Sequence, residues 1–278
     1  MRAKVAIGLT GRVIEASGAR PTTPRNDHQP QATPCATPGY DEGNGRWPGL
    51  AKDTMQTPHL SAGQLAGMID HTFLKASGTA DDIERLCREA MEYRFVAVMV
   101  HPCEVVRCVR LLAGTPVRVG TVAGFPLGQN TPAVKLHEIR DCLDNGAQEV
   151  DLVMNVRALQ AGEAAFVRAE MSALATACCE AGAVSKIILE TCYLTDDQKR
   201  LACRLAVEAE VDFVKTSTGF GTGGATAADV RLMAGAVESR AKVKAAGGIR
   251  TLADALAMVA AGASRLGCSS SVAIIQAL

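Results

Sequence analysis

The chain has 278 residues, of which 48% are hydrophobic and 21% are charged, an ordinary composition for one or two folded domains. The 29 Lys and Arg residues balance the 29 Asp and Glu residues, so the formal net charge is zero. This balance argues against nucleic acid or a membrane surface as the main partner, although it allows a local anion site.

The cysteine pattern and the hydropathy indicate a cytoplasmic protein. The 10 cysteines lack C-x-x-C spacing, and only Cys178 and Cys179 are adjacent. Scattered thiols are typical of buried free cysteines in a reducing compartment rather than of a disulfide framework. No apolar run reaches the roughly 18 to 20 residues that a membrane-spanning helix needs.

Residues 1–58 differ in composition from the rest of the chain. They are rich in Pro, Gly, Thr, Asn and Asp and show neither a helical nor a strand period. This composition predicts a disordered extension, for which a targeting role is a weak alternative. A misassigned start, with Met55 as the true first residue, would also explain the segment. Residues 59–278 are predicted to form the folded domain.

Strands and helices alternate from His59 onward. Helices are expected to begin near Ser61, to cover 79–94, and to cover 195–209 after a Thr cap. The apolar stripe of the 79–94 helix consists of Ile83, Leu86, Cys87, Ala90 and Met91. Eight strands are expected at 68–72, 95–101, 117–125, 149–155, 185–191, 213–218, 242–248 and 264–270.

Eight strands that alternate with helices predict an α/β fold of the (β/α)8 TIM-barrel type, whose usual size is roughly 250 residues. A doubly wound open sheet is the alternative. No G-x-G-x-x-G motif follows an early strand, as it would in a dinucleotide-binding sheet. Polar residues also recur at the strand ends, as the mouth of a barrel requires. Both features favour the barrel.

Three ionisable residues lie inside apolar strand segments: Asp151 in EVDLVMN, Lys215 in FVKTST and Lys244 in KVKAAGG. Because an unpaired buried charge is costly, each needs a partner or a chemical role. A buried Asp–Lys ion pair would explain one strand lysine, but it explains two lysines on successive strands less well. At the mouth of a barrel the two lysines would repel each other and lower each other's pKa.

A lysine with a lowered pKa can act as an amine nucleophile. An ordinary lysine has a pKa of about 10.4 and is protonated at neutral pH. Desolvation or a neighbouring cation brings the pKa to roughly 7 to 8, where the amine forms a Schiff base with a carbonyl carbon. The iminium is then an electron sink for carbon–carbon cleavage or formation, and Asp151 can move the protons.

Glycine and serine dominate the loops after the last three strands, GFGTGG (219–224), GGIR (247–250) and GCSSS (267–271). Barrels often bind phosphate with the loops after strands 7 and 8. Glycine N–H groups and the hydroxyl groups of Ser269 and Ser270 are suited to hold a phosphate there.

Several long motifs occur in the order found in deoxyribose-phosphate aldolases, which the chain resembles from about residue 61 to its end. These motifs are DHTFLK (70–75), GFPLG (124–128), EVDLVMN, ILETCYLTDDQK (188–199), DFVKTSTGFGTGGAT (212–226) and KAAGGIRTLADALAMVAAGASRLGCSSSVAI (244–274). One departure is Phe220, where some relatives carry a lysine.

The resemblance implies a role for each matched residue. Lys215 would form the Schiff base, Lys244 would perturb it and join the proton relay, and Asp151 would be the acid/base residue. Asp70 matches a supporting carboxylate near the substrate. The implied substrate contacts are Thr218 and Gly219, and the implied phosphate site is Gly247, Gly248, Ser269 and Ser270.

The implied activity is reversible cleavage of 2-deoxy-D-ribose 5-phosphate to acetaldehyde and D-glyceraldehyde 3-phosphate, in deoxyribonucleotide catabolism. It needs no metal or organic cofactor, its partner is a small phosphorylated sugar, and a homo-oligomer is compatible with it.

Two rival functions remain open at the level of sequence. One is a Schiff-base barrel that acts on another phosphorylated sugar. The other is a non-catalytic phosphate-binding barrel, which would have no use for two repelling lysines. A metal-dependent aldolase would need a histidine cluster, and His71 and His101 make a poor ligand set.

Overall fold

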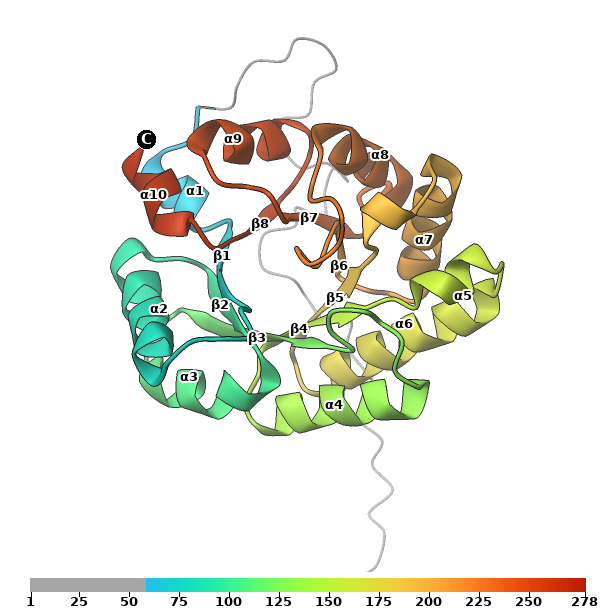
Figure 1. The fold of residues 1–278 in the computed structure, drawn as a ribbon, viewed down its shortest axis with the longest axis horizontal. Coiled ribbons are helices and arrows are strands. Elements are labelled where there is room, and N and C mark those ends of the chain that lie inside the picture. The colour runs from blue at the N-terminus through green and yellow to red at the C-terminus, as the bar shows by residue number, and fades with distance from the viewer. Residues whose placement is uncertain (1–58) are drawn as a thin grey trace, which may run out of the picture. The chain divides into compact units, whose positions relative to one another are not determined.

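The predicted strands pair in chain order and close into a barrel. The strands are β1 (Ile69–Phe73), β2 (Ala97–Val100), β3 (Arg118–Ala123), β4 (Glu149–Val153), β5 (Val184–Ile188), β6 (Phe213–Lys215), β7 (Lys242–Ala246) and β8 (Arg265–Cys268). All are parallel, and β8 pairs with β1, so the sheet has no free edge (Figure 1). This closure confirms the TIM barrel and excludes the open sheet.

A computed structural model describes residues 59–278. The extension predicted to be disordered, residues 1–58, lies outside the described residues.

Helices surround the barrel as an outer layer (Figure 1). They are α1 (Ala62–Ala66), α2 (Ala80–Tyr93), α3 (Val105–Leu111), α4 (Pro132–Asp144), α5 (Val156–Gln160), α6 (Ala164–Glu180), α7 (Asp196–Glu208), α8 (Ala227–Val237), α9 (Leu252–Ala260) and α10 (Ser271–Gln276), with short 3-10 turns η1 (Pro102–Glu104) and η2 (Thr191–Tyr193). No helix in the described part of the chain is both long and apolar enough to cross a membrane.

Capping side chains explain why two helices begin where the sequence predicts. Ser61 before α1 and Thr195 before α7 each accept a hydrogen bond from the backbone N–H group three residues later. The glutamine side chains at those positions, Gln64 and Gln198, accept in return from the N–H groups of the capping residues. This reciprocal arrangement satisfies donors that would otherwise lack partners at a helix start.

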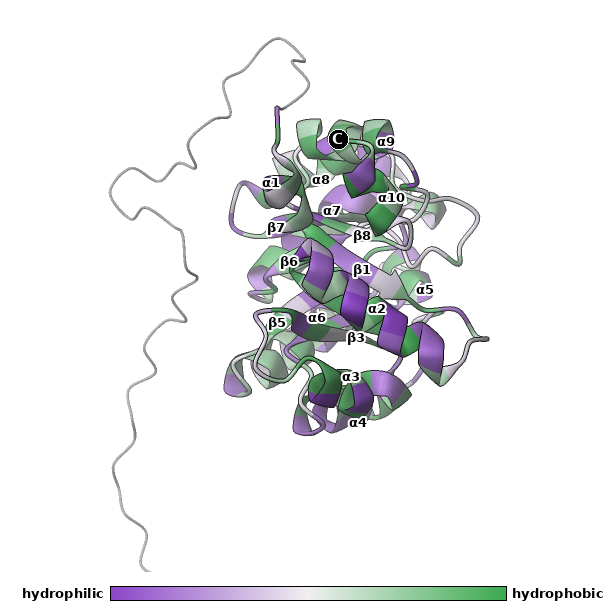
Figure 2. Cartoon of the chain, turned by 90° about the vertical axis from the view of Figure 1, so that its left-hand side faces the viewer, coloured by the Kyte–Doolittle hydropathy of each residue, from purple (hydrophilic) through white to green (hydrophobic). Residues whose placement is uncertain are grey.

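The apolar stripe of α2 is narrower than predicted. Ile83, Leu86, Cys87 and Ala90 are buried, but Met91 is 38% exposed, so its assignment to the stripe was wrong. At 3.6 residues per turn, Met91 lies at the outer edge of the stripe, where the helix turns toward solvent. Figure 2 shows hydrophilic residues along the outward side of α2.

The strand register brings the charged strand residues together. Strand β6 sets Lys215 opposite Lys244 of β7, and β4 sets Asp151 opposite Lys186 of β5. Paired residues of neighbouring strands direct their side chains to the same face of a sheet. The four side chains therefore meet on the inner face of the barrel.

Candidate active site

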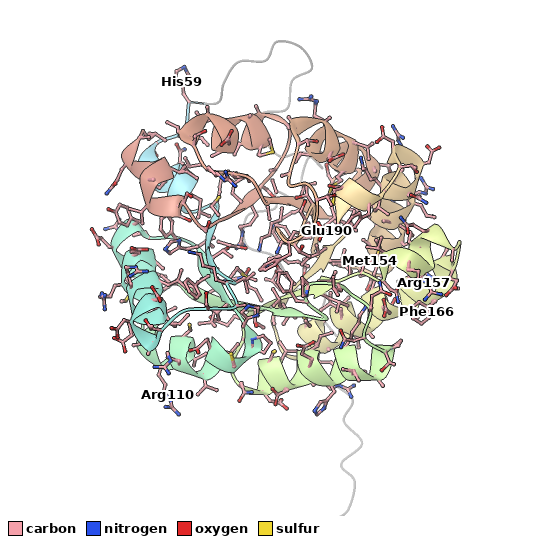
Figure 3. All side chains as sticks on the ribbon, in the orientation of Figure 1. His59, Arg110, Met154, Arg157, Phe166 and Glu190 are labelled. Atoms are coloured by element: carbon pink, nitrogen blue, oxygen red, sulfur yellow. The ribbon has the colours of Figure 1, made fainter. Side chains whose placement is uncertain are left out.

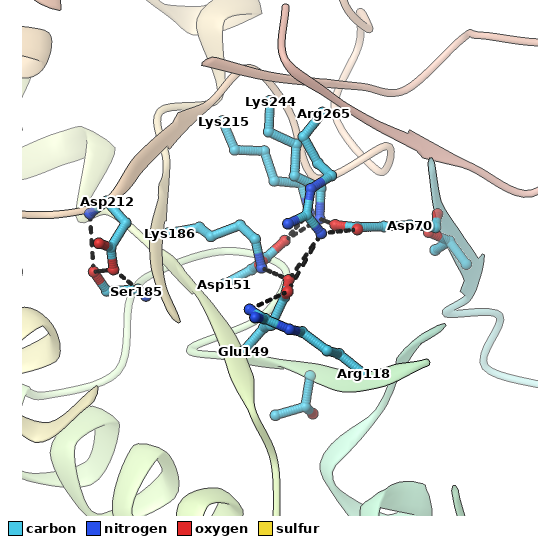
Figure 4. Close-up of polar contacts among 12 residues, drawn as sticks. Asp70, Arg118, Glu149, Asp151, Ser185, Lys186, Asp212, Lys215, Lys244 and Arg265 are labelled. Atoms are coloured by element: carbon cyan, nitrogen blue, oxygen red, sulfur yellow. Dashed lines mark hydrogen bonds and ion pairs between the residues drawn. The ribbon is translucent and has the colours of Figure 1, made fainter. Parts of the chain in front are cut away.

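The interior of the barrel holds a network of buried charges (Figure 4). Within residues 59–278, side chains from six strands form it through direct ion pairs. Its cations are Lys186, Lys215, Lys244 and Arg265, and its carboxylates are Asp70, Glu149 and Asp151. Such pairing is what makes the burial of these charges tolerable.

Asp151 is the centre of the network. Its Oδ2 atom lies 2.8 Å from Nζ of Lys215 and 2.8 Å from Nζ of Lys244, and its Oδ1 atom lies 2.9 Å from Nζ of Lys186. One carboxylate thus links the two lysines that the sequence singled out, and all four side chains are almost fully buried. The structure therefore brings the predicted catalytic residues Lys215, Lys244 and Asp151 into direct contact.

Asp70 joins the same cluster from β1. Its Oδ2 atom lies 2.5 Å from Nζ of Lys244, and its Oδ1 atom lies 2.6 Å from a guanidinium nitrogen of Arg265. Oδ2 accepts no well-directed hydrogen bond from any described residue, so its contact with Lys244 is best regarded as an ion pair. Asp70 is thereby linked to Lys215 through Lys244 and then Asp151.

Glu149, Lys186 and Arg265 form a second set of buried charges that contacts the predicted residues. They were not identified from the sequence. Glu149 lies 2.6 Å from Nζ of Lys186 and 3.2 Å from Arg265, and Arg118 approaches it at 3.6 Å from the half-exposed rim. The signal was available, because Lys186 in SKIILET and Arg265 in SRLGCSS are also charges inside buried strands. They were overlooked because no functional motif marks them.

The charge balance of the network singles out Lys215. Four cations face three carboxylates, so full ionisation would leave one positive charge in excess. Burial lowers the pKa of Lys215 to about 8, with Lys244 adding to the fall and Asp151 opposing it. For Lys186, burial is outweighed by Asp151 and Glu149, and its pKa is raised. Of Lys215 and Lys186, Lys215 is therefore the amine that gives up its proton more readily.

Asp151 and Asp70 remain ionised. Burial alone would raise the pKa of Asp151, but Lys186, Lys215 and Lys244 outweigh it and hold that pKa well below its usual range. For Asp70, burial is likewise outweighed, chiefly by Lys244 and Arg265, and its pKa is about 2. The site thus combines a readily neutralised amine with a fixed negative charge beside it, which suits amine nucleophilic catalysis.

The predicted substrate contacts Thr218 and Gly219 begin the loop after β6. The N–H and O–H groups of Thr218 both donate to the carboxyl group of Glu190, and its hydroxyl oxygen accepts from the N–H group of Phe220. The hydrogen-bonding groups of the Thr218 side chain are therefore already paired within the protein. Gly219 has a φ of +88°, which a glycine adopts without strain.

The predicted phosphate residues lie in the loops after β7 and β8, which are neighbouring strands. Gly247 and Gly248 have φ values of +86° and +81°, which glycine adopts without strain, and Gly248 is exposed. Ser269 is exposed and Ser270 is half-buried immediately before α10. All four residues are accessible in the positions where a barrel binds phosphate.

A pocket of about 350 Å³ opens on the other side of the Thr218 loop. Its walls come from the segments after β3, β4, β5 and β6. Phe220, 55% exposed, meets Phe125 of the loop after β3 edge-on, with ring centroids 5.3 Å apart. Of the predicted site residues, all of which are in the described range, only Thr218 lines this pocket. The pocket therefore does not enclose Lys215 or Lys244.

The two histidines considered for a metal site are satisfied elsewhere. His71 lies within hydrogen-bond distance of Glu89 and Ser271, at 2.7 and 3.0 Å, and His101 lies 3.0 Å from the carbonyl oxygen of Leu74. No group of three or more metal-ligating side chains suited to a metal ion occurs in the described part of the chain.

Comparisons with known proteins agree with this geometry. The family model of DeoC/LacD family aldolases matches residues 65–277. Deoxyribose-phosphate aldolase of Bacteroides thetaiotaomicron is 56% identical over 219 residues, covering 79% of this chain and 92% of that protein. That of Deinococcus radiodurans is 51% identical over 212 residues, covering 76% and 96%.

A solved structure of a deoxyribose phosphate aldolase has a similar fold. The deoxyribose phosphate aldolase from Aeropyrum pernix, described as tetrameric, superposes with a TM-score of 0.73 at 35% identity, covering 78% of this chain and 91% of that one. Fold, buried lysine pair and sequence similarity over nearly the whole barrel lead to one conclusion: this chain belongs to the DeoC/LacD family of aldolases.

Proposed function

We propose that this chain is a class I deoxyribose-phosphate aldolase, a lyase that reversibly cleaves 2-deoxy-D-ribose 5-phosphate to acetaldehyde and D-glyceraldehyde 3-phosphate. One observation carries the proposal. Lys215 is a buried amine with a pKa of about 8, and its Nζ atom lies 2.8 Å from a carboxylate that it shares with Lys244. The names of the relatives in the same family support the choice of substrate.

In the proposed mechanism, the neutral amine of Lys215 attacks C1 of the open-chain sugar and forms an iminium with loss of water. The Asp151–Lys244 pair takes the proton of the C3 hydroxyl group. The C2–C3 bond then breaks, and its electrons move toward the iminium to give an enamine. D-Glyceraldehyde 3-phosphate leaves, the enamine is protonated at C2, and hydrolysis releases acetaldehyde and the free lysine. Asp70 supports this pair by holding Lys244 in place.

We assign the phosphate group to the loops after β7 and β8. The backbone N–H groups of Gly247 and Gly248 and the hydroxyl groups of Ser269 and Ser270 are the donors proposed for it. Thr218 and Gly219 follow Lys215 in the loop after β6, and a Cβ atom on Gly247 would lie 3.5 Å from Cα of Gly219.

The experiment that tests the proposal is reductive trapping. The full chain is incubated with 2-deoxyribose 5-phosphate and cyanoborohydride, and the peptides are mapped by mass spectrometry. We expect a reduced adduct on Lys215. An adduct on Lys244 would keep the reaction but exchange the two lysine roles. A folded protein that binds phosphate and forms no adduct would support the non-catalytic barrel instead, and adducts with other sugar phosphates at greater rates would support the other rival.

The rate of trapping should depend on pH in a predictable direction. The neutral amine is the reactive form, and its fraction rises as the pH passes the pKa. With a pKa of about 8, roughly one Lys215 in ten is neutral at pH 7, against fewer than one in a thousand for an ordinary lysine. The initial rate should therefore increase between pH 6 and 8 and level off above pH 8. A rise that continues to pH 10 would contradict the lowered pKa.

We further propose that residues 59–278 form the catalytic domain. Deleting residues 1–54 should leave kcat/KM within about twofold of the full chain, because every proposed site residue lies in the barrel. A loss of tenfold or more would show that the extension takes part in function.

We propose a cytoplasmic location and self-association as well. The cysteines of residues 59–278 are free thiols, which suits a reducing compartment. Self-association is supported by the tetrameric description of the related Aeropyrum pernix enzyme.

A further inference from the structure

Glu190 has an unusual place at the end of β5. It is buried, with 3% of its surface exposed, and its φ and ψ of 55° and 64° are in the left-handed region. This conformation is strained for a non-glycine residue, so contacts with the surrounding structure must hold Glu190 in it. Figure 3 shows Glu190 inside the ring of helices, whereas Arg157 lies nearer the outer rim.

The residues on either side of Glu190 donate hydrogen bonds to the end of β6, which carries Lys215. Leu189 donates its N–H group to the carbonyl oxygen of Lys215 at 2.9 Å, and Thr191 donates to that of Thr216 at 3.0 Å. The left-handed turn between them directs the carboxyl group sideways, toward the loop that follows β6, rather than along β5.

The carboxyl group of Glu190 holds the start of that loop. It accepts from the N–H group of Thr218, at 3.2 and 3.3 Å to its two oxygens, and from the Thr218 hydroxyl group. Hydrogen bonds to an ionised carboxyl group are the stronger kind. Gly221 packs on the same group and on Cys192, since a Cβ atom there would lie 3.0 Å from Sγ of Cys192, 3.1 Å from Cδ and 3.2 Å from Oε1 of Glu190.

The far end of the loop rests on the proposed phosphate site. Ala225 donates its N–H group to the carbonyl oxygen of Gly247 at 2.9 Å. A Cβ atom on Gly224 would lie only 2.3 Å from that oxygen, so the two backbones touch. The loop over 218–224 is therefore fixed by Glu190 at one end and abuts the phosphate loop at the other.

We propose that Glu190 is a positioning residue that sets the 218–224 loop, and through it the Gly247 loop, for binding the phosphate end of the substrate. The inference rests on the proposed function and assigns Glu190 no contact with the reacting carbons. Glu190 makes no contact with the Lys215 amine, whose nitrogen is paired with Asp151 instead. Loss of the Glu190 carboxyl group should therefore weaken phosphate binding and leave imine formation unchanged.

The test compares the full chain with Glu190→Gln and Gly221→Ala. Glu190→Gln replaces one acceptor oxygen by a donor. Gly221→Ala pushes a methyl group against the same carboxyl group and against Sγ of Cys192, without changing a charge. We expect each variant to weaken binding of inorganic phosphate, measured by calorimetry, about 10-fold. The KM for 2-deoxyribose 5-phosphate should rise by a similar factor, with kcat within about threefold. The rate of reductive trapping of acetaldehyde on Lys215 should stay within about twofold.

Glu138→Gln is the matched control. Its carboxyl group also accepts from a backbone N–H group at the mouth, that of Gly124 at 2.7 Å, but it serves the loop after β3. We expect it to leave phosphate affinity and KM within about twofold. Unchanged phosphate affinity in both test variants, or an equal loss of acetaldehyde trapping, would overturn the inference.

The phosphate titration also separates this inference from the proposed function. It needs no turnover, so it gives an answer for Glu190 even if the wild-type chain fails to cleave 2-deoxyribose 5-phosphate. Gly221→Ala decides the matter if Glu190→Gln does not fold.

Discussion

Replacing Lys215 with alanine is expected to lower kcat/KM for cleavage of 2-deoxyribose 5-phosphate by at least about 10⁴-fold, because no other amine takes its place as nucleophile. The barrel should nevertheless fold. Removing Lys215 leaves three cations facing three carboxylates in the network, so no buried charge loses its only partner. Steady-state kinetics and thermal unfolding, measured on the same preparation, check both statements.

Lys199→Ala is the control for this prediction. Lys199 is also a largely buried, ion-paired lysine, held by Asp229 at 2.6 Å, but it lies on α7 outside the barrel. The Lys199→Ala substitution should leave kcat/KM within about twofold of the wild-type value. Activity of Lys215→Ala within tenfold of wild type would remove Lys215 as the nucleophile.

Replacing Asp151 with asparagine should separate imine formation from cleavage. The substitution keeps the shape of the side chain but removes the carboxylate that three lysines share, so kcat should fall by about 10² to 10⁴-fold. Asp151 also opposes the lowering of the Lys215 pKa, and without it that pKa should fall further. Trapping of acetaldehyde should therefore persist and extend to lower pH while sugar cleavage is lost.

The same substitution should destabilise the fold. Removing one partner from a buried ion cluster typically costs about 3 to 5 kcal/mol of unfolding free energy. Glu149→Gln is the matched control, because Glu149 contacts Lys186 and Arg265 but neither Lys215 nor Lys244. It should lose stability to a similar extent and keep kcat within about tenfold. Equal loss of trapping and cleavage in Asp151→Asn would contradict its role in proton transfer.

The local sequence was sufficient to predict the architecture. All eight strands were placed within a few residues of their bounds, because each is a short apolar run between turn-forming residues and amphipathic helices. The caps at Ser61 and Thr195 were also predictable, since they depend on residues three positions apart. Met91 was misplaced because periodicity gives the direction of an apolar stripe more reliably than its width.

The proposed catalytic residues were singled out for a different reason. Asp151, Lys215 and Lys244 are charges inside apolar strands, and a charge in such a place needs a physical explanation wherever the strand lies. The motifs around them then supplied the family resemblance, which the match over residues 65–277 bears out.

Only the tertiary structure decided how these charges are shared. The barrel brings Lys186, Glu149 and Arg265 into the network from strands that are distant in sequence. Burial inside the barrel lowers the pKa of Lys215, and Lys244 and Lys186 add to the fall. The partner of Thr218 is likewise Glu190, 28 residues away, which binds it only because β5 and β6 are neighbours. The sequence by itself determined which residues are charged and which segments are strands. Their partners and protonation followed from closure of the barrel, because electrostatic interactions depend on distance and burial, which no local pattern contains.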